Sequence, residues 1–138
     1  MRQLVYTTLS NAGNITGYVG DRIYEANALG TPPLPSSPDI PFLIIQSMPN
    51  LVHQQVNKTA RSATQVFDIR AYDERGDYLR IETLLRIVRD TLLGLVLQVS
   101  PSGARCTDAK WQSFGPDSDD PVLDKIFKTV TMRFLTNV

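Results

Sequence analysis

Residues 63–94, ATQVFDIRAYDERGDYLRIETLLRIVRDTLLG, contain the two clearest periodic patterns of the chain, one directly after the other. Alternation of side chains predicts a half-buried strand from Ala63 to Asp73, with Phe67, Ile69 and Ala71 on one face. The apolar residues that follow have the i, i+3, i+4, i+7, i+11 spacing of one helix face. They are Ile81, Leu84, Leu85, Val88 and Leu92. The sequence therefore predicts a helix that packs on a sheet through this stripe.

The turn between this strand and this helix is rich in carboxylates. Asp77 is suited to cap the first turn of the helix, and Gly94 is suited to end the helix. Asp73 and Glu74 lie beside Asp77, and two such carboxylates can in principle perform acid–base catalysis. Because they cluster where a strand turns into a helix, we interpret them as structural.

The N-terminal part contains a helix, a strand and a long polar stretch. Arg2 to Leu9 has apolar residues at helical spacing, and the breaker cluster Asn11–Asn14 is expected to end this helix. Phe42 to Met48 is an apolar run that predicts a strand. Pro49 to Ser62 is polar, which predicts a long β-hairpin with its tip near Asn57 and Lys58. Loops longer than a turn requires are usually functional.

The C-terminal part predicts further strands. Leu95 to Val99 and Ala104 to Phe114 have moderate strand character, and an acidic loop follows from Gly115 to Pro121. Asp124 to Asn137 is apolar or β-branched on both faces, which predicts a central strand that is covered on both sides.

These elements predict an α+β fold with an antiparallel sheet of about four to five strands and two helices packed on one face. The long β-hairpin joins the first two core strands. A length of 138 residues predicts a single domain, residues 1–138. Fourteen basic and fourteen acidic residues cancel, so no partner held mainly by nucleic-acid electrostatics or by an anionic membrane is indicated. Without an apolar run of signal or membrane-spanning length, we expect the chain to mature in a cytoplasm.

Residues that could carry chemistry are sparse. His53 is the only histidine and Cys106 the only cysteine, which argues against a catalytic triad and a zinc site. No glycine-rich phosphate-binding motif is present. The acidic residues of the C-terminal loop suggest calcium, but they lack the EF-hand glycine and glutamate, so we interpret them as a solvated turn. They are Asp117, Asp119, Asp120 and Asp124. We expect no catalytic residues, no metal and no cofactor.

The order of the parts resembles the tail terminator, or tail completion, proteins of long-tailed phages. A short helix is followed by Val19–Tyr24, by a gap with prolines, and by Pro38–Ile45. The likeness continues with the long hairpin, the strand that ends at Arg70–Asp73, one amphipathic helix, and a closing strand with Thr131–Phe134. It covers nearly the whole chain, although each motif by itself is unspecific.

The resemblance implies a virion protein at the head-proximal end of the tail, without enzymatic activity. Such proteins form a hexameric ring on the tail tube, stop its polymerisation and dock to the filled head. The expected partners are other copies of the chain, the tail tube protein and the head–tail connector or stopper protein, and genomic DNA passes through the ring without specific binding. There are two alternatives. The first is a head-side connector, that is, a stopper or head-completion protein, and the second is a small cytosolic enzyme or regulatory subunit.

Two groups of residues are candidates for the contacts of such a ring. The hairpin residues are expected to contact the tail tube or a neighbouring subunit, and they are His53, Gln54, Gln55, Asn57, Lys58 and Arg61. The proline-rich segment Gly30–Pro41 is expected to be an extended surface loop, because proline cannot pair inside a sheet. Its candidates for the ring interface are Pro32, Pro33, Pro35 and Pro38.

Overall fold

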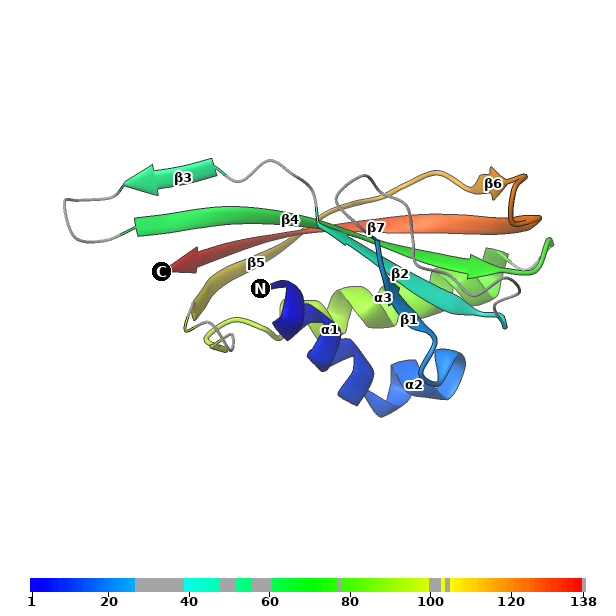
Figure 1. Ribbon diagram of the computed structural model, residues 1–138, viewed down its shortest axis with the longest axis horizontal. Coiled ribbons are helices and arrows are strands. Elements are labelled where there is room, and N and C mark those ends of the chain that lie inside the picture. The colour runs from blue at the N-terminus through cyan, green and yellow to red at the C-terminus, as the bar shows by residue number, and fades with distance from the viewer. Residues whose placement is uncertain are drawn as a thin grey trace.

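The structure is a computed structural model that describes residues 1–26, 39–47, 52–55, 61–76, 78–99, 103 and 105–137, with only the backbone described for 52–55, 61–63 and 137. The helices within these residues are α1 (Arg2–Asn11), α2 (Gly13–Val19) and α3 (Tyr78–Leu93). The strands are β1 (Ile23–Glu25), β2 (Phe42–Ser47), β3 (Val52–Gln55), β4 (Arg61–Asp73), β5 (Arg105–Phe114), β6 (Ser118–Asp120) and β7 (Lys125–Asn137). The helices lie on one face of one twisted sheet (Figure 1). The predicted α+β class is confirmed.

The two long strands β4 and β7 form the middle of the sheet. They pair antiparallel along almost their full length, from Ser62 opposite Asn137 to Asp73 opposite Ile126. β2 and β3 pair with the free side of β4, and β5 and β6 pair with the free side of β7. β1 joins β2 in parallel.

Over the described residues the sheet is therefore mixed and has seven strands, whereas an antiparallel sheet of about four to five strands was predicted. β1 and β6 have three residues each, and a segment so short shows no alternation of side chains. These strands form because a long neighbour offers free backbone hydrogen-bonding groups. The predicted long hairpin is present in the backbone, since β3 turns back to pair antiparallel with the start of β4.

α3 packs on the sheet through the predicted stripe. Its buried residues are Ile81, Leu84, Leu85, Val88 and Leu92, which confirms the predicted orientation. They share one core with the inward-facing residues of the two central strands, among them Ile69 of β4 and Val130 of β7.

The N-terminal helix ends at the predicted breaker cluster, with Asn11 as its last residue, but a second helix that was not predicted follows directly. The chain bends at Ala12 and continues as α2, so the described part of the chain covers the sheet with three helices rather than the two predicted. Ile15 and Val19 lie four residues apart and are fully buried with Val5 and Leu9. Burial of this second apolar stripe offsets the low helix propensity of Gly13 and Asn14.

The opposite face of the sheet is only partly covered. At one end a small second core contains a row of aromatic rings, Tyr24, Phe42, Tyr72 and Phe127. The centroids of neighbouring rings are 5.8 Å apart for Tyr24 and Phe42, 4.8 Å for Phe42 and Tyr72, and 5.1 Å for Tyr72 and Phe127. Burial raises the pKa of the Tyr72 hydroxyl. Towards the other end Arg133 and Leu135 of β7 are exposed. The prediction that the last strand is covered on both sides is therefore wrong over this half.

Two further segments differ from their predictions. Residues 94–97 form turns, and Val99 makes a single bridge with Arg105, so no strand runs from Leu95 to Val99. Leu95 is buried under the end of α3, which requires a turn at this point. The acidic loop contains β6, which forms by pairing with the start of β7.

Candidate interaction surfaces

The junction between β4 and α3 is fixed by Asp73, which is fully buried. Its carboxylate accepts a hydrogen bond from the backbone amide of Glu74 at 2.7 Å and a two-pronged contact from the Arg80 guanidinium. A buried carboxylate needs such partners, because desolvation otherwise penalises its charge. Asp73 is thus committed to holding the first turn of α3 against the sheet. Asp77 lies outside the described residues.

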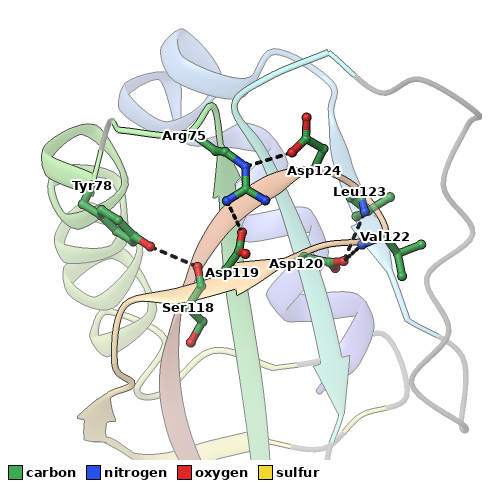
Figure 2. A network of polar contacts seen from close by, with 8 residues as sticks. All are labelled: Arg75, Tyr78, Ser118, Asp119, Asp120, Val122, Leu123 and Asp124. Atoms are coloured by element: carbon green, nitrogen blue, oxygen red, sulfur yellow. Dashed lines mark hydrogen bonds and ion pairs between the residues drawn. The ribbon is translucent and has the colours of Figure 1, made fainter.

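The turn between β6 and β7, which we call the β6–β7 tip (residues 118–124), is held by the β4–α3 junction (Figure 2). The Arg75 guanidinium lies between two carboxylates, with Nη1 2.7 Å from Asp119 Oδ1 and Nε 2.8 Å from Asp124 Oδ1. The hydrogen bonds to Asp124 and then to Asp119 raise the pKa of Arg75. One arginine therefore ties both sides of the turn to a segment about fifty residues earlier in the chain.

Additional hydrogen bonds order the same turn internally. Asp120 Oδ1 accepts from the amides of Val122 and Leu123, at 3.1 and 3.2 Å. Tyr78 of α3 donates from its hydroxyl to the carbonyl of Ser118 at 3.2 Å (Figure 2). In contrast, the Val122 side chain has no packing role, because 90% of the residue is exposed. The tip is thus an ordered turn that presents one apolar side chain.

The acidic side chains of this region form ion pairs or hydrogen bonds with other groups of the protein. Asp117 lies 3.3 Å from the Lys128 Nζ, which also donates to Glu82 at 2.9 Å. The hydrogen bond to Glu82 raises the pKa of Lys128 most, and the contact with Asp117 raises it further. Among the described residues no group of three or more histidine, cysteine or acidic side chains is arranged to hold a metal ion. Asp117, Asp119, Asp120 and Asp124 thus make their described contacts with protein groups.

A second exposed feature lies where β5 passes beside α3. We call it the α3–β5 surface and define it by Arg86, Arg89, Trp111 and Phe114. The Arg89 guanidinium carbon is 5.0 Å from the centroid of the Trp111 ring and 5.4 Å from that of Phe114. The two rings are 4.9 Å apart, and 43% of Trp111 is exposed. Cation–π contacts of this kind fix the arginine over the rings.

A shallow hollow of about 40 Å³ adjoins this surface. It is lined by Glu82, Leu85, Arg86, Phe114 and Lys128. Glu82 is already paired with Lys128, and Arg89 forms an ion pair with Asp90 at 2.9 Å, so Arg86 provides the positive charge of the rim. No local sequence pattern predicts this surface, because Trp111 is separated from α3 along the chain.

The residues predicted to form contacts are described only in part. β3 places the backbone of His53 opposite Ala63 and that of Gln55 opposite Arg61. Asn57 and Lys58 lie outside the described residues, as do Pro32, Pro33, Pro35 and Pro38, and the side chains of His53, Gln54, Gln55 and Arg61 are not described either. These candidates therefore remain predictions.

An apolar loop after α3 was not anticipated. Leu97 has a φ of 72°, which is unusual for a residue with a side chain, and it is 68% exposed. Its amide donates to the Cys106 carbonyl at 2.7 Å, and the Cys106 amide donates to Gln98 at 2.9 Å. Burial raises the pKa of the Cys106 thiol, so this thiol is protected from reaction.

No described helix is both long and apolar enough to span a membrane. No family model and no curated protein sequence matches the chain. Solved structures do match it. A chain from the virion of a native gene transfer agent (GTA) particle superimposes with a TM-score of 0.73 at 18% identity, over 97% of this chain and 92% of that chain. A second structure, which carries no functional name, has a TM-score of 0.58 at 14% identity, over 99% of this chain and 96% of the other. At these identities the likeness establishes a shared fold.

Proposed function

We propose that this chain is a structural virion protein of the tail terminator kind. The observation that carries the proposal is the match over nearly the full length of both chains to a component of a gene transfer agent virion. The order of elements in the sequence, which resembles that of tail terminator proteins, supports the more specific role within a virion. In this proposal the subunits form a hexameric ring at the head-proximal end of the tail tube, end tube polymerisation and provide the surface to which the head docks.

The proposal requires two different contact patches on each subunit, because a ring is closed by heterologous contacts. The β6–β7 tip and the α3–β5 surface are two such exposed features. The β3–β4 hairpin is a third candidate, for the tube or a neighbour. The remaining partners are the tail tube protein and the head–tail connector, and genomic DNA crosses the ring without specific binding. No step in this function needs a catalytic group, a metal or a cofactor.

The test is the phenotype of particles that are made without this chain. Filled heads and unattached tails with tubes of abnormal length are the expected products. In a separate experiment, native mass spectrometry of the purified protein, alone and with tail tubes, is expected to show a cyclic oligomer. Normal tails attached to empty heads would instead assign the chain to the head side as a connector. Turnover of a substrate that is lost in His53→Ala would overturn a structural role.

A further inference from the structure

The β6–β7 tip is more ordered than the stability of the domain requires. Ion pairs at the surface contribute little to folding, yet Arg75 holds two carboxylates of the tip and Asp120 holds two of its amides. What these contacts fix is the position of Val122, which is exposed to 90%. A rigid turn that presents an apolar residue loses little conformational entropy when it binds, which is the property of a docking element.

The α3–β5 surface has the composition of a site that receives such an element. Tryptophan and arginine are the residues most enriched in the energetic centres of protein interfaces, and here Trp111 and Arg89 are already stacked. Phe114 and Leu85 provide an apolar floor to the neighbouring hollow, and Arg86 provides a positive rim. The tip has three carboxylates and is held by one arginine, so it is negative overall. Its small apolar side chain matches the hollow in shape, and its net charge is opposite to that of Arg86.

A single subunit cannot bring the two features together. Asp120 pairs with Lys125, whereas Phe114 and Trp111 pair with Val130 and Met132, five and seven residues further along the same strand β7. Five to seven residues of a strand span roughly 16–23 Å. The tip, flanked by Asp119 and Asp124, must therefore meet the α3–β5 surface of another molecule.

We propose that the β6–β7 tip of one subunit docks on the α3–β5 surface of the next copy, with Val122 beside Trp111 and Phe114 and with the tip carboxylates facing Arg86 and Arg89. This inference rests on the proposed ring and specifies its interface. The contact is heterologous, as ring closure requires, because the donating and receiving surfaces differ. Both surfaces belong to this chain, which favours a second copy over an unrelated partner.

Cysteine cross-linking tests this contact. Cys106 is buried, so the wild-type protein serves as an unreactive background. The double variant Val122→Cys/Arg86→Cys, treated with a short bis-maleimide, is expected to form a ladder of covalent oligomers up to the size of the ring. Either single variant alone should remain monomeric, because a heterologous contact brings unlike positions together. A mixture of the two single variants should form covalent dimers and nothing larger.

A second pair of variants tests the energetic role of the tip. Val122→Lys is expected to weaken self-association roughly tenfold or more without a change in the melting temperature. The matched control is Leu97→Lys, which places the same charge on an exposed leucine near the opposite end of β7 and should leave association unchanged. Equal association of Val122→Lys and the wild type would contradict the proposal.

The outcomes separate this inference from the proposed function. Rings that are seen by native mass spectrometry without the covalent ladder would overturn the tip contact and leave the ring in place. Covalent dimers formed by a single variant alone would also overturn it, since they would indicate a symmetric contact. A protein that remains monomeric, alone and on tail tubes, would overturn both the ring and its interface.

Discussion

The two faces of the sheet have different surroundings. On the helix-covered face, alternate residues of β4 and β7 such as Ile69 and Val130 are fully buried under α1, α2 and α3. On the open face, the aromatic row covers one end, while Asp68 and Thr131 share a hydrogen bond of 2.7 Å in the middle and Arg133 is exposed. Apolar content along β7 is therefore a poor guide to which face is covered.

This difference indicates where the stability of the fold resides. A helix stripe provides a continuous apolar surface, so residues beneath it lose all contact with water. The open face has no such cover among the described residues, and its side chains contribute through pairs across neighbouring strands. We expect substitutions on the helix-covered face to be costly and matched substitutions on the open face to be tolerated. The following variants test this expectation, from the largest effect to the smallest.

Leu85→Asp should have the largest effect, because it places an unpaired charge between α3 and the sheet. Burial of such a charge costs several kcal/mol, so we expect unfolded or insoluble protein. The matched control is Leu135→Asp on the open face, where 36% of the residue is exposed, and this variant should remain folded. The measurement is soluble yield together with the melting temperature. A soluble Leu85→Asp protein with an unchanged melting temperature would contradict the assigned packing of α3.

Asp73→Ala should come next. It removes the buried carboxylate that joins β4 to the first turn of α3, and it leaves the Arg80 guanidinium without this partner. Loss of one member of a buried ion pair costs about 3–5 kcal/mol, and the partial exposure of Arg80 places the expected loss near the lower end. Glu74→Ala, at the exposed neighbouring position, is the control and should change the free energy of unfolding little. Equal urea midpoints for the two variants would refute this role of Asp73.

The elements that these two variants test differ in how well the sequence predicts them. The stripe of α3 and the course of β4 and β7 could be predicted, because regular burial of one face imposes a period on the sequence. α2 and β6 could not, since α2 begins at a breaker cluster and β6 has no apolar alternation. Arg75 pairs with Asp119 and Asp124 only after the chain has folded, because they are far apart in the sequence. No local sequence pattern therefore predicts these ion pairs.

Lys128 provides a smaller effect that depends on pH. It lies between β7 and α3, and its pKa is raised by Glu82 and Asp117. A raised pKa means that the folded state binds the proton more tightly, so this stabilisation is complete below the ordinary pKa of about 10.4. It is lost as the pH rises through the raised pKa. Lys128→Met should therefore be less stable than the wild type by about 1–2 kcal/mol at neutral pH.

The difference between these two proteins should shrink as the pH rises through the raised pKa of Lys128, where the wild-type lysine loses its proton. The measurement is the urea midpoint of both proteins across this range, and the comparison cancels the titration of the tyrosines. A difference that stays constant with pH would mean that packing of the lysine stem, rather than its charge, stabilises the junction.

The smallest effect on stability is expected at the β3–β4 hairpin, which extends beyond the helices (Figure 1). Replacement of Gln54–Arg61 by Asn-Gly keeps a turn that suits a two-residue hairpin and should leave the melting temperature nearly unchanged. If this segment contacts the tail tube or a neighbour, the ordering of its backbone, at about 1–2 kcal/mol per residue, requires an extensive contact such as strand addition. Joining of heads to tails should then fail, whereas His53→Ala, which keeps the hairpin, should still assemble. Infectious particles at normal titre from the shortened chain would show that the hairpin is dispensable. The proposed contacts would then have to be made by the opposite end of the sheet, where Asp120 and Arg75 hold the β6–β7 tip in place.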